Sequence, residues 1–120
     1  MGTTTVNMRV CRVDKPDLCK MVKGAVVDTG ATVSAIPAAV AKELGIKFPV
    51  KRKFLLADGR TSVKRVGSAW IELDGRKAST EIIALTKGRP LLSVLALESL
   101  GFTVDPKTRT LKKQEVSLLL

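Results

Sequence analysis

Apolar and polar residues alternate along several short stretches of the chain, and this period of two residues is typical of β-strands that bury one face. The first two stretches, residues 6–10 and 18–27, are separated by a polar turn that contains Pro16. Further stretches of the same character lie at residues 51–56, 61–66, 68–73, 77–85, 102–104 and 109–113. The pattern therefore predicts a chain that is mostly β-structure.

Turn and helix signals complete this prediction. Asp-Gly pairs at residues 58–59 and 74–75 are typical of tight β-hairpin turns. Helical spacing and good helix formers are confined to residues 38–44 and 91–100, and a glycine suited to end a helix follows each stretch. The 120 residues fit one domain spanning residues 1–120. We therefore predict an all-β single domain, closed and rich in strands, with one or two short helices.

Composition excludes several kinds of site. The chain has no histidine, which excludes Ser-His-Asp catalysis, Cys-His catalysis and imidazole ligands for metals. Two cysteines, Cys11 and Cys19, cannot make a four-cysteine zinc site, and we predict no metal. Pairing in the first hairpin could place the two cysteines opposite each other and permit a disulfide, but we expect two thiols in a reducing compartment.

The chain carries no clear membrane or export signal. Its first ten residues are polar and lack the apolar segment of a signal peptide. The longest apolar stretch, residues 25–41, is interrupted by Asp28 and Pro37 and makes a poor membrane span. We therefore expect a cytoplasmic protein with no membrane partner.

The chain is strongly basic. Lysine and arginine number 21 against 11 acidic residues, which gives a net charge of +10 and makes nucleic acid a possible partner. Single-strand binding relies on aromatic stacking, and the chain has 3 phenylalanines, 1 tryptophan and no tyrosine. Nucleic-acid binding is therefore not favoured, and we expect a solvated basic surface, with Trp70 in the core.

The segment that follows the second predicted strand carries the most chemical information. Asp28 comes directly after the apolar residues 25–27, and Thr29 and Gly30 follow it. A carboxylate at the end of a buried strand is partly removed from water, and a glycine permits a tight loop and close approach of backbone. The threonine hydroxyl could hydrogen-bond to a neighbouring loop. The tripeptide alone is weak evidence, so its context decides.

The residues around this tripeptide resemble those of a known family. Residues 26–37 closely resemble the active-site motif of the aspartic proteases, and the chain as a whole resembles a single-domain, retroviral-type member, a retropepsin-like protease. The resemblance covers about residues 18–105. The hairpin at residues 57–60 stands where the family has its flap, and residues 91–93 stand where it has two hydrophobic residues and a glycine before its main helix, here residues 94–100.

The resemblance implies an aspartic endopeptidase that needs no cofactor and acts on a polypeptide substrate. Its catalytic residues would be Asp28, Thr29 and Gly30. Substrate-binding residues would be Ala31 and four residues of the flap turn, namely Ala57, Asp58, Gly59 and Arg60. From its position in the turn alone, Asp58 is interpreted as a residue that stabilises the hairpin.

The chain contains one Asp-Thr-Gly motif, whereas this chemistry needs two carboxylates. The resemblance therefore implies a homodimer in which Asp28 of each chain meets its counterpart and Thr29 bonds across the interface. We expect a C-terminal hairpin, starting near residue 103, to help build that interface. Residues 115–120, which end in three leucines, are expected to pack or to join the interface.

Ser93 departs from the family pattern, which has glycine at this position. This departure and the basic flap leave an alternative open. In that alternative the chain is a catalytically weak or inactive dimer of the same fold that serves as a peptide-binding or interaction module.

Overall fold

The computed structural model describes residues 3–114. Seven strands form one sheet in the order β1-β2-β7-β3-β6-β5-β4, and β8 pairs with β9 in a separate two-stranded sheet. The strands are β1 (Thr5–Cys11), β2 (Cys19–Asp28), β3 (Ser34–Pro37), β4 (Val50–Leu55), β5 (Thr61–Leu73), β6 (Arg76–Leu85), β7 (Leu91–Ser93), β8 (Phe102–Asp105) and β9 (Thr110–Lys113). The helices are α1 (Ala38–Leu44) and α2 (Val94–Leu100). The predicted all-β fold with two short helices is confirmed.

The large sheet closes on itself. An additional pairing between β1 and β5 joins six of its strands into a ring, and β4 extends from β5 beyond that ring. Inside lies one hydrophobic core, to which α2 contributes Leu97 and Leu100. The buried faces of the strands contribute Met8, Val10, Val22, Ile36, Ala69, Ile71, Ile82 and Leu92. Neither helix in residues 3–114 is long and apolar enough to cross a membrane.

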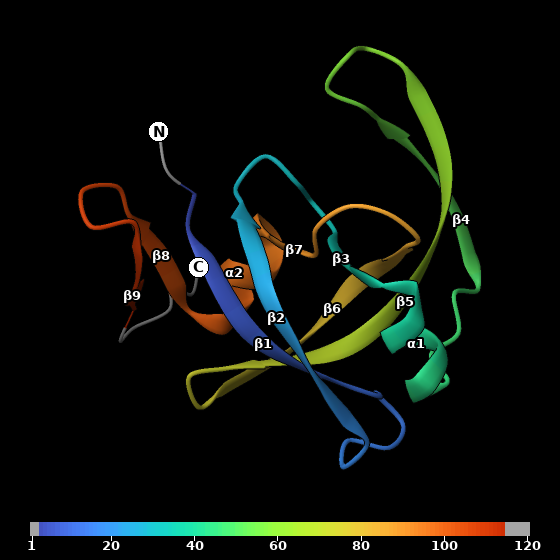
Figure 1. Cartoon of the computed structure of the whole chain (residues 1–120), viewed down its shortest axis with the longest axis horizontal. Helices are drawn as coiled ribbons and strands as arrows, with labels where there is room; N and C mark the ends of the chain where they lie inside the picture. Colours follow the sequence, from blue (N-terminus) through green and yellow to red (C-terminus); the bar gives the residue numbers. More distant parts are fainter. Residues whose placement is uncertain (1–2, 115–120) are drawn as a thin grey trace, which may run out of the picture.

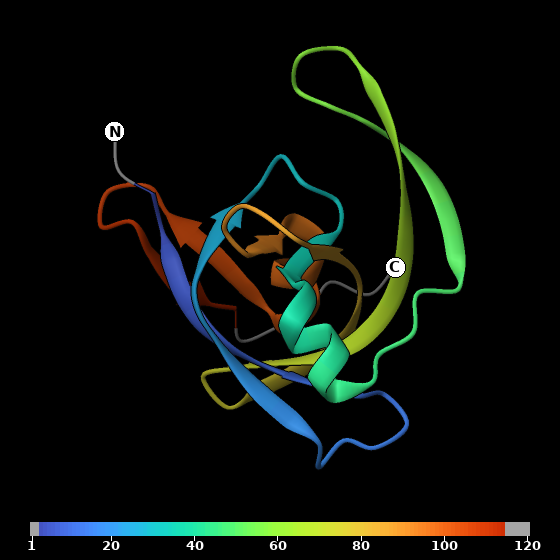
Figure 2. The ribbon, with the colours of Figure 1, turned by 45° about the vertical axis from the view of Figure 1, so that its right-hand side comes forward.

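The hairpin of β4 and β5 is the predicted flap, and it is the most prominent projection of the molecule. Figures 1 and 2 both show it rising from the body on the side toward which the loop after β2 also points. The two strands pair from Val50 with Val66 to Leu55 with Thr61. The predicted turn at residues 57–60 therefore forms the tip of a long two-stranded arm.

The separation of residues 61–66 and 68–73 into two strands was wrong, because β5 runs without interruption from Thr61 to Leu73. Gly67, which lies between the two predicted stretches, is a point of close packing. A Cβ atom at Gly67 would collide with the carbonyl oxygen of Lys47. The missing side chain therefore lets a neighbouring loop lie directly against the strand.

The prediction of one helix over residues 91–100 was also wrong in its first three residues. Leu91–Ser93 form β7, which pairs in parallel with Val26–Asp28 of β2 and is joined on its other edge to β3 through Ala35. Strand β3 itself was not predicted. Both strands are short and mostly buried, so they show a continuous apolar run instead of the alternation that reveals a half-exposed strand.

The two cysteines are joined, which corrects the expectation of free thiols. Cys11 and Cys19 face each other as register partners at the end of the β1–β2 hairpin and form a disulfide. The structure therefore contains the alternative in which pairing of the first hairpin places the two cysteines opposite each other and permits a disulfide. Disulfides are more usual in oxidising compartments, and the cytoplasmic location stays a prediction.

Trp70 does not lie in the core as expected. It is half-buried, because Ala69 and Ile71 occupy the inward positions of β5 and Trp70 points to the opposite face. There the ammonium group of Lys77 lies over the Trp70 ring, 5.3 Å from the ring centroid, in a cation–π contact. The side chain therefore covers the outside of the barrel.

The predicted C-terminal hairpin is present as β8 and β9, which lie beside the N-terminal strand in Figure 1. Thr4 donates a hydrogen bond from Oγ1 to the carbonyl oxygen of Arg109 at 2.9 Å. The Arg76 guanidinium donates to the carbonyl oxygens of Gly101 and Gln114 at 2.8 and 2.9 Å and so fixes the start and end of this unit. The predicted packing of residues 115–120 lies outside the described residues.

Candidate active site

Asp28 is the last residue of β2, where the strand meets a tight loop. It is half-buried, and its neighbour across the sheet is Ser93 of β7. The backbone N–H of Gly30 donates to Oδ1 of Asp28 at 2.9 Å, and the N–H of Ala31 donates to the Asp28 carbonyl oxygen at 3.2 Å. The loop thereby holds the carboxylate against its own backbone.

Glycine at position 30 suits this arrangement. A Cβ atom added there would lie 3.3 Å from Oδ1 of Asp28, which is tighter than an ordinary contact. Any larger residue would press on the carboxylate that the loop orients. Gly30 therefore acts by close approach of backbone to a side chain.

A buried pair of serines lies behind the loop. Ser34 and Ser93 are both fully buried, at 0% exposure. The backbone N–H of Ser93 donates to Oγ of Ser34 at 2.9 Å, and the Ser34 hydroxyl donates to Oγ of Ser93 at 3.2 Å. Ser93 Oγ also accepts from the N–H of Ala96 at 3.2 Å and so caps the first turn of α2. Ser93, which stands where the family pattern has glycine, thus has hydrogen-bond partners for both its backbone and its side chain.

A cavity of about 500 Å³ opens in front of Asp28. Its floor is formed by Asp28, Gly30 and Ala31, and its roof by the flap residues Leu55, Leu56 and Ala57. The other lining residues are mostly apolar and come from β3, β6, β7 and the loop after β2, with Phe54 and Lys64 from the two flap strands. They are Thr32, Val33, Ala35, Phe54, Lys64, Ile83, Leu85 and Leu91. A carboxylate therefore faces an apolar trough under a hairpin.

The family follows from the sequence match. The model of a family described as aspartyl protease matches residues 20–98, more than half of the chain. This chain belongs to the aspartyl protease family. No curated protein matches it.

Solved retroviral proteases share the fold of this aspartyl protease family member. The simian foamy virus (mac) protease is 16% identical, with a TM-score of 0.53 over 78% of this chain and 91% of the viral one. The EIAV protease, solved in complex with the inhibitor HBY-793, is 20% identical, with a TM-score of 0.54 over 83% of this chain and 89% of the viral one. The fold is therefore the retropepsin-like fold.

The predicted site residues of this family member fall into two groups. Asp28, Gly30, Ala31 and Ala57 all line the cavity. Thr29 is exposed and lies outside the lining. Its proposed bond across a dimer stays a prediction.

The other three flap residues also lie outside the lining, and they stabilise the turn. Asp58 accepts hydrogen bonds from the backbone N–H of Arg60 at 3.0 Å and from Nε of Arg60 at 2.6 Å. Gly59 adopts a φ of +87°, a left-handed conformation that favours glycine. The interpretation of Asp58 as a turn residue agrees with this geometry.

Sequence reasoning missed most of the apolar walls and the serine pair. The wall residues carry no chemical signal of their own, and only the pairing of β3 with β6 and β7 brings residues 83–91 next to residues 31–35. Ser34 could have been suspected as a small polar residue inside the apolar segment 33–36. Its partner lies on β7, which the sequence did not reveal as a strand.

Charge on the inner face of the flap is partly neutralised within the chain. Arg52 of β4 donates from both terminal nitrogens to the Glu81 carboxylate of β6 at 2.7 and 2.8 Å. These hydrogen bonds, more than the charge alone, hold the pKa of Glu81 below its ordinary value. The pair ties the base of the flap to the barrel.

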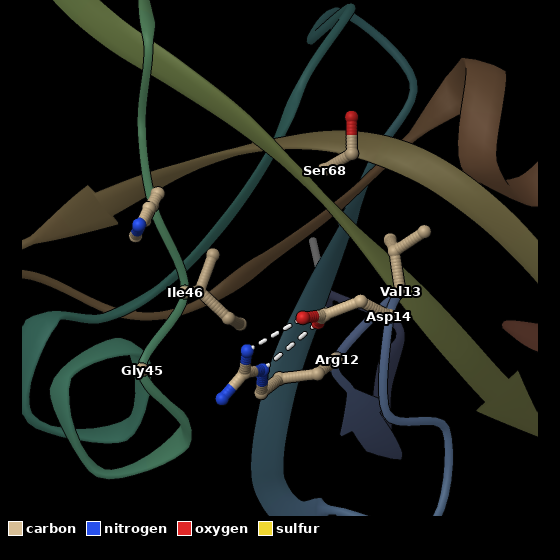
Figure 3. Close-up of a pocket in the computed structure, with 7 residues that line it drawn as sticks. Arg12, Val13, Asp14, Gly45, Ile46 and Ser68 are labelled. Atoms are coloured by element: carbon tan, nitrogen blue, oxygen red, sulfur yellow. Dashed lines mark hydrogen bonds and ion pairs between the residues drawn. The ribbon is translucent and has the colours of Figure 1, made fainter.

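A second cavity of about 290 Å³ lies away from this site, between the end of β1 and the segment after α1 (Figure 3). Arg12 and Asp14 face each other there in a doubly hydrogen-bonded pair at 3.0 and 2.7 Å, and the guanidinium lowers the pKa of Asp14. None of the predicted site residues lines this cavity. Residues 3–114 also contain no group of three or more acidic or cysteine side chains that could hold a metal ion.

Proposed function

We propose that this chain is an aspartic endopeptidase that acts as a homodimer. The observation that carries the proposal is the position of Asp28 on the floor of a largely apolar cavity of about 500 Å³ beneath the flap. A trough of this kind suits an extended peptide, whose backbone can hydrogen-bond to strand edges while its side chains enter apolar pockets. The family match supports the same activity.

The need for two carboxylates supports the dimer. Asp28 belongs to the one Asp-Thr-Gly sequence in the chain. In an acid–base pair of carboxylates about 3 Å apart, both cannot be ionised at low cost, so the pair shares one proton. A two-fold axis beside Asp28 would supply the second carboxylate from an identical chain.

The reaction then follows from this shared proton. The ionised carboxylate accepts a proton from a water molecule, whose oxygen attacks the carbonyl carbon of the scissile bond. The protonated carboxyl donates its proton to the carbonyl oxygen, and a tetrahedral intermediate forms. When the C–N bond breaks, the amine leaves with a proton from the dyad. The hydrogen bond from Gly30 to Asp28 Oδ1 orients the carboxylate for these transfers.

The β8–β9 hairpin is the proposed contribution of the C-terminal region to the dimer. It forms a small separate sheet beside the N-terminal strand, on the side of the barrel that lies away from the flap arm in Figure 1. Its strand edges would be available to a second copy.

The test is cleavage of an unfolded protein across about pH 3 to 7, with Asp28→Asn as the matched control. We expect cleavage by the wild type alone, with a rate that rises faster than linearly with enzyme concentration where the dimer dissociates. If a folded and dimeric wild type binds peptides without cleaving them, the peptide-binding alternative replaces the proposal.

A further inference from the structure

One cation faces the proposed substrate. Among the described residues that line the cavity, Asp28 and Lys64 are the only ionisable side chains. All other lining residues are apolar, glycine or threonine. Lys64 is therefore the one positively charged side chain in an otherwise largely apolar lining.

The strand register explains why Lys64 reaches the cavity. Lys64 of β5 is the partner of Arg52 on β4, and Phe54, two residues beyond Arg52, shares that face and lines the cavity. Lys53, between the two, points to the opposite face and does not line the cavity. The basic character of the flap is therefore divided between two faces, and Lys64 belongs to the inner one.

The local charge balance leaves Lys64 unpaired. Its neighbour Arg52 is bound to Glu81 through two hydrogen bonds. Within residues 3–114, no carboxylate oxygen lies within 4.0 Å of the Lys64 ammonium group. The inner face of the flap thus presents one uncompensated positive charge toward the cavity.

We propose that Lys64 selects peptides with an acidic side chain close to the scissile bond. This inference rests on the proposed function, because it assigns the substrate class of that same site. A glutamate or aspartate under the flap would pair with the exposed ammonium group at the edge of the trough, while apolar neighbours of that residue fill the trough. In a symmetric dimer each protomer contributes one Lys64, so acidic residues are favoured at two positions, one on each side of the cleaved bond.

The experiment uses a set of peptides with one apolar cleavage sequence, in which Glu, Gln or Lys is placed in turn at each of the flanking positions. For the wild type, we expect kcat/KM to be about fivefold higher for Glu than for Gln at the position that meets Lys64, a ratio at the upper end for partly exposed ion pairs. The preference should weaken as the salt concentration rises.

Three variants assign the preference to this residue. Lys64→Met should remove the difference between Glu and Gln, and Lys64→Glu should reverse it in favour of Lys. Lys53→Met removes one positive charge from the opposite face of the same hairpin and should retain the wild-type preference. If Lys53→Met loses the preference as fully as Lys64→Met does, a diffuse field and not Lys64 is responsible, and the inference is overturned.

Binding to the Asp28→Asn variant, followed by fluorescence anisotropy of labelled peptides, separates this inference from the proposed function. Equal cleavage of Glu and Gln peptides at every position overturns the role of Lys64 and leaves the protease intact. Absence of cleavage with about fivefold tighter binding of the Glu peptide, lost in Lys64→Met, overturns the protease and supports Lys64. Absence of both overturns both.

Discussion

The buried pair of Ser34 and Ser93 offers the sharpest test of how the loop that carries Asp28 is held. Replacing Ser34 with alanine removes the acceptor of the Ser93 backbone N–H and the donor to Ser93 Oγ. The stranded N–H cannot rotate toward water, because Ser93 is fully buried. An unsatisfied buried donor costs about 1–3 kcal/mol, and the second bond adds about 1 kcal/mol. We therefore expect Ser34→Ala to lower the free energy of unfolding by about 3 kcal/mol.

Replacing Ser93 with glycine, the residue typical of the family, should be milder. Ser34 Oγ still accepts from the backbone N–H of residue 93, and the main-chain group that loses its acceptor is the Ala96 N–H in the first turn of α2. Glycine at a helix N-cap costs a few tenths of a kcal/mol relative to serine, and the lost hydroxyl–hydroxyl bond about 1 kcal/mol. Ser93→Gly should therefore cost about 1.5 kcal/mol and should not raise the catalytic rate.

Urea unfolding followed by the fluorescence of Trp70, the single tryptophan, measures both effects. The protomer concentration is held fixed, since dimerisation would add to the apparent stability. The control is Ser68→Ala at an exposed position of β5, which should change stability by less than about 0.5 kcal/mol. The reasoning is refuted if Ser93→Gly costs more than Ser34→Ala, or if the double variant costs the full sum of the two, because the shared bond should make the sum about 1 kcal/mol too large.

Three other features lead to predictions. Gly30→Ala places a Cβ atom 3.3 Å from the Asp28 carboxylate and should lower kcat at least tenfold, with a stability loss of less than about 1 kcal/mol. A kcat equal to the wild-type value would contradict the proposed role of this loop. Replacement of Cys11 and Cys19 by serine removes a disulfide that joins residues 8 positions apart in the sequence. It should lower the free energy of unfolding, measured in urea, by about 2.5 kcal/mol. No change would show that the disulfide is not formed in solution. The pKa of Glu81 is lowered in the folded chain, so its pairing with Arg52 stabilises the fold above the ordinary value of 4.5 and is lost as the pH falls through the lowered value. Glu81→Gln should therefore be less stable than the wild type at neutral pH, by no more than about 1 kcal/mol for so exposed a pair, and equally stable in strong acid; a stability gap that persists in acid would contradict this account.

The sequence predicted the parts of the fold that have a local signal. The alternation in residues 6–10 and 77–85 and the Asp-Gly turns correctly indicated half-exposed strands and hairpins, because one face of each strand meets water. The second helix was correctly ended at Gly101, which adopts a φ of +78°. Asp28 was found because its motif is contiguous in sequence.

Features that depend on contacts between distant residues escaped sequence reasoning. Strands β3 and β7 are too short and too buried to alternate, so their existence is evident only from their pairing. Trp70 was expected in the core, yet its position in the alternation of β5 puts it outside. The inner position of Lys64 within the basic flap follows from register, which depends on where the turn falls.

The insertion of β7 between β2 and β3 sets an order of events during synthesis. A growing chain that has left the ribosome as far as β6 already contains Asp28, but the strand that must lie beside it, Leu91–Ser93, has not yet appeared. Until then the inner edges of β2 and β3 lack their neighbour, and such open edges invite pairing with other chains. The loop that carries Asp28 thus cannot be completed before the last quarter of the described chain is available. An incomplete chain therefore cannot form the proposed site, and folding depends on slow, long-range pairing.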